Sequence, residues 1–202
     1  VFKLRGDPKR DAILPFIGQR SVALSSGDAM AATLAVKMSK SGRVSVKGKL
    51  VDGTSFTASA KAEIGDGWIG APVTVRKTKS GKMTTLAFRV AYDLESGSLD
   101  IVNCTPLKVA DKKSGEVLSE SELEVAAAGK PALTKDVVKA MSVVVEGKDA
   151  PTKTSVSFNA KTGQLTATLK FKTVNEKGRK VTVTEKLYGV DVDGVIYAIR
   201  GL

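Results

Sequence analysis

Apolar and polar side chains alternate along several short segments of this chain, which is the pattern of a strand with one buried side. Residues 33–38 (TLAVKM) and 43–50 (RVSVKGKL) alternate in this way, and the dipeptide Asp52-Gly53 is typical of a tight turn. Alternation resumes over residues 55–60 (SFTASA), so the pattern predicts three consecutive antiparallel strands, a β-meander. The side chains expected on the buried side of the first two strands are Leu34, Val36, Met38, Val44, Val46, Gly48 and Leu50.

A short motif recurs between such segments: a charged residue, Ser or Thr, Gly, any residue, then an apolar residue. Clear copies begin at Lys40, Lys79 and Lys161, and looser copies begin at Glu95 and Lys113. Glycine supplies the positive φ that ends a type I turn with a G1 bulge, and the hydroxyl can bond to the backbone of the turn. Each copy therefore predicts a hairpin turn.

The C-terminal region repeats the arrangement. Residues 154–158, 165–172, 181–184 and 194–199 alternate or are rich in β-branched residues, and turns are predicted at Gly163 and over residues 175–178. This region therefore predicts a second set of antiparallel hairpins.

Helical periodicity is confined to two short segments. Residues 119–128 (SESELEVAAA) predict either a short helix ended by Gly129 and Pro131 or a loop followed by a strand. Thr134 to Met141 predicts a helix with Thr134 as N-cap and an apolar stripe of Val137, Val138 and Met141. Residues 1–28 contain two prolines and three glycines, and are either a linker or an N-terminal strand that docks on the main sheet.

These elements predict an all-β protein of antiparallel hairpins and meanders, closed as a β-barrel or stacked as a sandwich, with at most one or two short helices. Residues 29–202 are expected to form the all-β unit, preceded by segment 1–28. Gly42 and Gly163 lie 121 residues apart in equivalent turns, which suggests two related halves that meet near residues 105–130.

Two segments, Ser39 to Ala60 and Val156 to Phe171, resemble the strand–glycine turn–strand signatures of repeated β-domains in large extracellular multidomain proteins of some bacteria. The resemblance covers about a third of the chain and lies in turn chemistry. It implies a non-catalytic surface or secreted module, and it brings no catalytic residues with it.

The chain has a strong excess of basic side chains. Its 202 residues include 32 Lys and Arg against 21 Asp and Glu, a formal charge of +11, which attracts polyanions. Two groups of basic residues lie beside alternating apolar residues, so each group is either a polyanion-binding surface or the solvated side of a strand. The first is Arg76, Lys77, Lys79 and Lys82; the second is Lys170, Lys172, Lys177, Arg179 and Lys180.

The residue types that are missing exclude several kinds of chemistry. The chain has no histidine and one cysteine, Cys104, which excludes histidine-dependent acid–base catalysis, His/Cys zinc sites and an internal disulfide. Cys104 is expected to be a small buried apolar side chain. No apolar run approaches the roughly 18 residues that span a bilayer, so no transmembrane segment is expected.

Several motif-like strings lack the surroundings that their chemistry needs. Residues 65–70 (GDGWIG) match GxGxxG, but an extended, Pro-containing stretch follows where a dinucleotide site needs a helix. Residues 191–194 (DVDG) begin like a calcium loop, but Val195 and Leu202 stand at later ligand positions, so a hairpin turn is predicted. Carboxylate and Ser–Lys pairs are numerous, and none has a distinctive setting. No enzyme activity, cofactor or metal site is therefore predicted.

Trp68, the only tryptophan, lies in the glycine-rich loop and is either a ligand contact or a side chain folded over the end of the sheets. The sequence as a whole predicts a non-catalytic structural or adhesion module that is extracellular, at the cell surface or periplasmic. The alternative is a binder of an acidic polymer, polysaccharide or nucleic acid, through a basic sheet face. The expected partners are other domains of a multidomain surface protein or an acidic polysaccharide.

Overall fold

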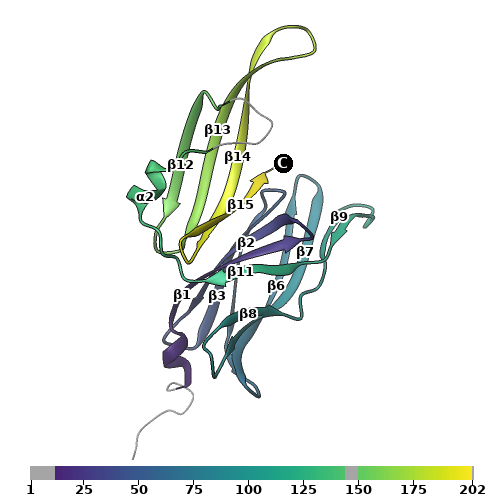
Figure 1. Ribbon diagram of the computed structural model, residues 1–202. Coiled ribbons are helices and arrows are strands. Elements are labelled where there is room, and N and C mark those ends of the chain that lie inside the picture. Colours follow the sequence, from purple (N-terminus) through teal and green to yellow (C-terminus); the bar gives the residue numbers. More distant parts are fainter. Residues whose placement is uncertain (1–11, 144–149, 202) are drawn as a thin grey trace, which may run out of the picture.

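Three antiparallel β-sheets make up the structure, a computed structural model that describes residues 12–143 and 150–201. Sheets A and B stack on each other in the lower part of Figure 1, and sheet C projects beyond them. In the described ranges the helices are short: η1 (Leu14–Phe16) and α2 (Lys135–Ala140). The all-β prediction is confirmed, and the sheets are stacked as a sandwich instead of closed as a barrel.

Sheet A has five strands in the order β11-β1-β2-β3-β4. The predicted meander is confirmed, because β3 pairs with both β2 and β4. Residues 18–26 of the N-terminal segment form β1, whereas residues 1–11 lie outside the described ranges. The strands are β1 (Gly18–Ser26), β2 (Ala29–Met38), β3 (Arg43–Leu50), β4 (Ser55–Lys61) and β11 (Glu124–Gly129).

Sheet B has six strands around the long β6–β7 hairpin. The apolar sides of sheets A and B share one core, which includes Leu34, Val46, Phe88 and Tyr92. Cys104 is half-buried against this core; burial and then the charge of Glu122 raise the pKa of its thiol. The strands are β5 (Glu63–Ile64), β6 (Trp68–Lys79), β7 (Lys82–Asp93), β8 (Leu99–Val102), β9 (Leu107–Asp111) and β10 (Val117–Ser121).

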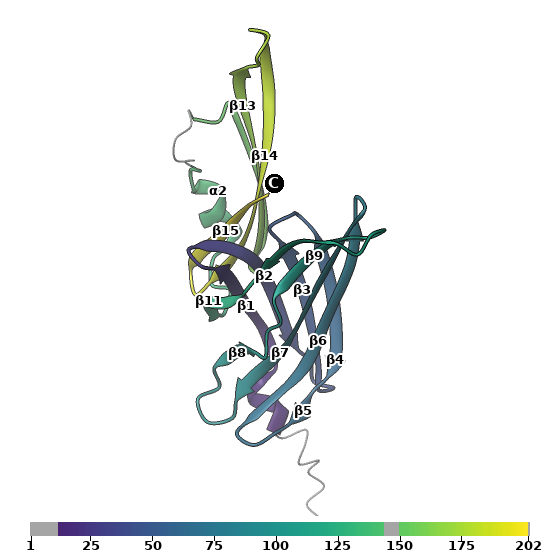
Figure 2. The same ribbon diagram turned by 90° about the vertical axis from the view of Figure 1, so that its right-hand side faces the viewer.

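Sheet C packs one of its ends on the outer side of sheet A, and the rest extends beyond the sandwich (Figure 2). Ala23 of β1 lies in a small cluster with Val190 and Val192 of sheet C. The strands, in spatial order, are β12 (Lys153–Asn159), β13 (Gln164–Val174), β14 (Lys180–Val192) and β15 (Val195–Gly201).

Strand β2 is covered on both sides, because sheet B packs on one side and sheet C on the other. Residues 31–36 are consequently buried without a break, where alternation alone predicts that every second side chain meets water. Thr33 and Ala35, on the outer side, are 1% and 3% exposed. Small side chains at these positions let the third sheet approach.

The predicted glycine turns are confirmed. The glycine has a φ between 68° and 77° in all five copies of the motif, Gly42, Gly81, Gly97, Gly115 and Gly163. In three copies the hydroxyl before the glycine accepts a hydrogen bond from the N–H of the residue after it. These acceptors are Ser96, Ser114 and Thr162, at 3.2, 3.2 and 3.4 Å.

Of the two helix candidates, one is a helix. Residues 119–128 lie in β10, a short connection and β11, so the helical alternative is wrong; pairing with β9 and β1 supplies the backbone bonds that a helix would have made. The helix after Thr134 is confirmed, with the Thr134 hydroxyl accepting from Val137 N at 3.4 Å. Its apolar stripe is narrower than predicted, because Val138 is buried but Val137 and Met141 are exposed.

Candidate functional site

Basic and hydroxyl side chains cover the solvent side of strands β3 and β4. Because Val44, Val46 and Leu50 point into the core, the alternate residues of β3 point outward. Strand register places these residues beside the outward residues of β4 and the exposed end of β2. The outward side chains are Lys37, Arg43, Ser45, Lys47, Lys49, Ser55, Thr57, Ser59 and Lys61.

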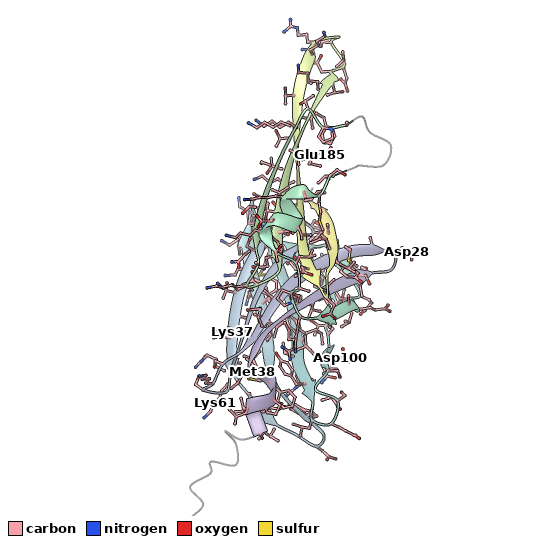
Figure 3. All side chains as sticks on the ribbon, turned by 60° about the vertical axis from the view of Figure 1, so that its left-hand side comes forward. Asp28, Lys37, Met38, Lys61, Asp100 and Glu185 are labelled. Carbon is pink, nitrogen blue, oxygen red and sulfur yellow. The ribbon has the colours of Figure 1, made fainter. Side chains whose placement is uncertain are left out.

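We call Lys37, Arg43, Lys47, Lys49 and Lys61 the basic face. None of them forms an ion pair with another described residue. The stretch from residue 29 to 51 carries five basic and no acidic side chains, so no carboxylate on β2 or β3 neutralises this face. In Figure 3, Lys37 and Lys61 lie on one side of the molecule, and Asp28 and Asp100 on the opposite side.

The predicted group at residues 76–82 divides between two sides of sheet B. Lys77, Lys79 and Lys82 share the side that faces sheet A, near the end of the β6–β7 hairpin. Arg76 points the other way, with its Nε 3.2 Å from Met83 Sδ. The four residues therefore do not form one patch, and Lys79 is the member that approaches the basic face.

Lys79 reaches the β3–β4 turn, where its Nζ donates to the Asp52 carbonyl at 3.0 Å. The Asp52 carboxylate accepts from Thr54 N at 2.7 Å and from Thr54 Oγ1 at 2.8 Å, which fixes the turn. A side chain at Gly53 would meet both Lys79 Nζ and the Tyr188 hydroxyl. This turn therefore lies between sheet B and sheet C.

Lys49 is the most enclosed member of the basic face. Its Nζ donates to Ser55 Oγ at 2.6 Å and lies 4.3 Å from the centroid of the Tyr188 ring. Partial burial lowers the pKa of Lys49, the charges of Lys79 and Lys186 lower it further, and Asp52 opposes them. Lys49 and Lys79 thus approach the Tyr188 ring from sheets A and B, and Lys186 lies two residues before Tyr188 on the same side of β14.

A cleft of about 270 Å³ opens beside Lys49, between sheets A and C. Gln164 Nε2 donates to the Lys47 carbonyl at 3.3 Å across this boundary. The lining combines ammonium groups, hydroxyls and an amide with the Tyr188 ring. Its polar side chains are Thr33, Lys47, Lys49, Ser55, Thr57, Gln164, Thr166 and Tyr188.

The second predicted basic group continues from this cleft along sheet C. Lys170, Lys172 and Lys180 share the side of the sheet on which Tyr188 and Lys186 lie, by register and alternation. Lys177 and Arg179 belong to the turn at the far end of the β13–β14 hairpin. The basic surface therefore extends from β4 across the cleft to the projecting part of sheet C.

The members of the basic face on β2, β3 and β4 were missed as site residues by sequence reasoning. The available signal was the alternation of basic residues with buried apolar residues over 43–50 (RVSVKGKL). Such alternation is also typical of any solvated strand, so only the neighbouring strands show that the charges accumulate.

Trp68 lies at the other end of the β6–β7 hairpin, at the first residue of β6, and is half-buried. The guanidinium carbon of Arg89 lies 4.5 Å from the centroid of its ring. Trp68 lines a separate cleft on the outer side of sheet B. The GxGxxG segment continues into β6, an extended strand, as predicted.

The calcium-like string 191–194 forms the predicted turn between β14 and β15, and its carboxylates have structural partners. Asp191 Oδ2 accepts from Ala132 N and Leu133 N, both at 2.6 Å, and Oδ1 accepts from Gly194 N at 2.9 Å. Asp193 Oδ1 accepts from Lys130 N at 2.9 Å. These bonds attach the segment that follows β11 to sheet C.

Comparison of the chain with family models, curated proteins and solved structures finds no match. The resemblance to repeated bacterial β-domains therefore stays a prediction. Among the helices in the described ranges, none has the length and apolar character needed to cross a membrane.

Proposed function

We propose that this chain is a non-catalytic, extracytoplasmic β module that binds an acidic polysaccharide across its basic face. The observation that carries the proposal is that Lys49 and Lys79 lie beside the Tyr188 ring and the Asp52–Gly53 turn, next to a row of basic side chains that form no ion pair with a carboxylate in the described ranges. An anionic group in the cleft would relieve the repulsion between these ammonium groups.

The hydroxyl groups of the surface favour a saccharide as the anion carrier. Ser55, Thr57 and Thr166 line the cleft beside the lysines, so a ligand that carries both charges and hydroxyls finds partners for each. A surface this rich in lysine also attracts a polymer over several sites at once, which raises its overall affinity.

Single-stranded nucleic acid is a weaker candidate for this surface. Single strands are usually held by bases stacked on aromatic rings. Tyr188 is the one aromatic residue besides the inward-facing Phe56 that lines the cleft, and Lys49 already lies over its ring. Nucleic acid binding is therefore an outcome for the experiment to distinguish.

The test measures binding of the protein to heparin, to polygalacturonate and to duplex DNA at low and raised ionic strength. The double variant Lys47→Gln/Lys49→Gln should bind the acidic polysaccharides about tenfold more weakly, at about 0.5–1 kcal/mol for each lost charge contact. The control is Lys135→Gln/Lys139→Gln on α2, which removes the same charge away from the basic face.

The two double variants separate a binding surface from a net-charge effect. Equal weakening in both would contradict the proposed surface, as would the absence of binding to either polysaccharide at low salt. Tighter binding to duplex DNA than to both polysaccharides would show that the surface serves nucleic acid instead.

A further inference from the structure

A second cleft lies on the outer side of sheet B, so the sandwich separates it from the basic face. Its volume is about 750 Å³, within the size range of ligand-binding clefts. In Figure 3, Asp100 of this cleft lies on the opposite side of the molecule from Lys37 and Lys61. The polar lining comes from Asp66, Trp68, Arg89, Asp93, Ser96, Ser98, Asp100 and Asn103.

Trp68 and Arg89 form a fixed wall of this cleft. The guanidinium of Arg89 lies over the indole, and its Nη1 donates to Glu63 Oε2 at 3.2 Å. Glycine at position 65 makes room for the ring, because a Cβ there would clash with the indole of Trp68. Two side chains held in this way lose little conformational entropy when a ligand binds.

The wall and the opposite lining offer unused hydrogen-bonding groups. A guanidinium has five N–H donors, and Arg89 uses one of them, on Glu63, within the described ranges. The side chains of Asp66 and Asn103 form no hydrogen bond with another described residue, and Asp100 uses only Oδ1, on Ile101 N. Donors and acceptors therefore face the same space.

Asp93 lines the same cleft, and one oxygen of its carboxylate accepts hydrogen bonds from the loop that follows it. Its Oδ1 accepts from Ser96 N at 2.6 Å, from Ser96 Oγ at 2.7 Å and from Glu95 N at 3.1 Å. These bonds, those from Ser96 first, hold the pKa of Asp93 below its usual value, so the carboxylate stays charged at neutral pH. Asp93 thus shapes the loop that carries Ser96 and Ser98.

We propose that this cleft binds a neutral saccharide. Sugar hydroxyls both donate and accept, and Arg89 supplies donors while Asp66, Asp100 and Asn103 supply acceptors. The exposed part of the indole offers apolar surface for the C–H side of a sugar ring. Three carboxylates against one guanidinium that is already paired disfavour an acidic sugar, so this ligand class differs from the polymer of the basic face.

The test uses the fluorescence of Trp68, which as the only tryptophan reports on this cleft alone. The full chain is titrated with neutral oligosaccharides of glucose, galactose, mannose and N-acetylglucosamine, with calorimetry as a second readout. At least one of them should change the emission saturably and release or absorb heat with the same midpoint.

Two variants and one control assign the binding to the named residues. Arg89→Lys keeps the charge but not the planar donors, and Asp66→Asn removes one carboxylate; each should weaken binding about tenfold, with folding checked by circular dichroism. Lys47→Gln/Lys49→Gln should bind the neutral sugar unchanged, whatever happens to its binding of acidic polymers.

Three results would overturn the inference. They are no response to any of these sugars in either readout, unchanged affinity in both cleft variants, and a change in Trp68 emission caused by heparin instead of the neutral sugars. Binding of acidic polymers to the basic face is measured in separate samples. A negative result for the neutral sugars therefore does not affect the test of the basic face, and the reverse also holds.

Discussion

Among the described residues, Tyr92 is the largest fully buried side chain, and its hydroxyl has no hydrogen-bond partner there. The ring packs against Phe16 with the centroids 5.5 Å apart, so its apolar part is well accommodated in the core. A buried hydroxyl without a partner has lost its bonds to water and gained none. Tyr92 therefore combines favourable packing with an unfavourable polar group.

Replacing Tyr92 by Phe should raise the free energy of unfolding by about 1 kcal/mol, because the desolvated hydroxyl is removed and the ring is kept. Denaturant unfolding at neutral pH measures this change. Tyr92→Leu is the control, and it should destabilise because it also removes ring volume. A loss of stability in Tyr92→Phe would mean that the hydroxyl has a favourable interaction, such as with a buried water.

The same substitution should change the response to alkali. Burial raises the pKa of Tyr92 from 10.0 to about 12, against partial opposition from Arg20. As the pH rises, the unfolded chain therefore releases the Tyr92 proton before the folded chain does. Ionisation of Tyr92 does not affect the free energy of unfolding below pH 10, and it lowers that free energy progressively as the pH rises towards 12. Tyr92→Phe should therefore lose less stability than the parent between these pH values, and parallel curves would contradict the assignment.

At the scale of the elements, the structure joins its parts through turns and short connections. The carboxylate of Asp191 is fully buried, and it binds two N–H groups of the segment between β11 and α2 and one of its own turn. One side chain therefore holds together the end of sheet A, the β14–β15 turn and the approach to α2. Sequence reasoning predicted the turn correctly, but it could not see the partners, which lie 58 and 59 residues earlier in the chain.

Asp191→Ala should lower the free energy of unfolding by roughly 2–4 kcal/mol, because it leaves buried N–H groups without acceptors. Asp191→Asn keeps one acceptor oxygen, so its free energy of unfolding should lie between those of Asp191→Ala and the parent. Denaturant unfolding followed by circular dichroism measures both variants. Equal stability of the Ala variant and the parent would show that water replaces the carboxylate.

At the scale of the whole molecule, the two cores are unequal. The large core draws all its buried members from residues 16 to 123, whereas the small one needs Ala23 of the sandwich together with Val190 and Val192 of sheet C. Sheets A and B thus contain a complete core, and sheet C depends on the outer side of sheet A for its own. We therefore expect sheets A and B to fold without sheet C, and sheet C to need sheet A in order to fold.

A fragment of residues 12–129 should therefore fold alone, and a fragment of residues 150–202 should not. Dispersed amide resonances in NMR spectra distinguish the two states. The first fragment keeps the basic face and Lys79 but lacks Lys186 and Tyr188, so it should bind heparin detectably and more weakly than the full chain. An unfolded 12–129 fragment would show that sheet C is required for the sandwich.

The sequence by itself determined part of the local structure: the strands within 33–60 and 154–199, the glycine turns and the start of α2. These features depend on residues within a few positions of one another, through alternation, positive φ and capping. The sequence left residues 1–28 and 119–128 each between two alternatives. It also indicated Lys79 and Trp68 as residues to examine, from their types and their immediate neighbours.

Only the tertiary structure decided which faces meet. The burial of Thr33 and Ala35, the pairing of β1 with β11 and the third layer arise from contacts between segments far apart in the chain. The basic face follows from register, which sets Arg43 opposite Lys61, and the packing of sheet C on sheet A places the Tyr188 ring beside Lys49. Alternation says that a side chain points outward, but not what lies next to it, because that depends on the packing of every sheet at once.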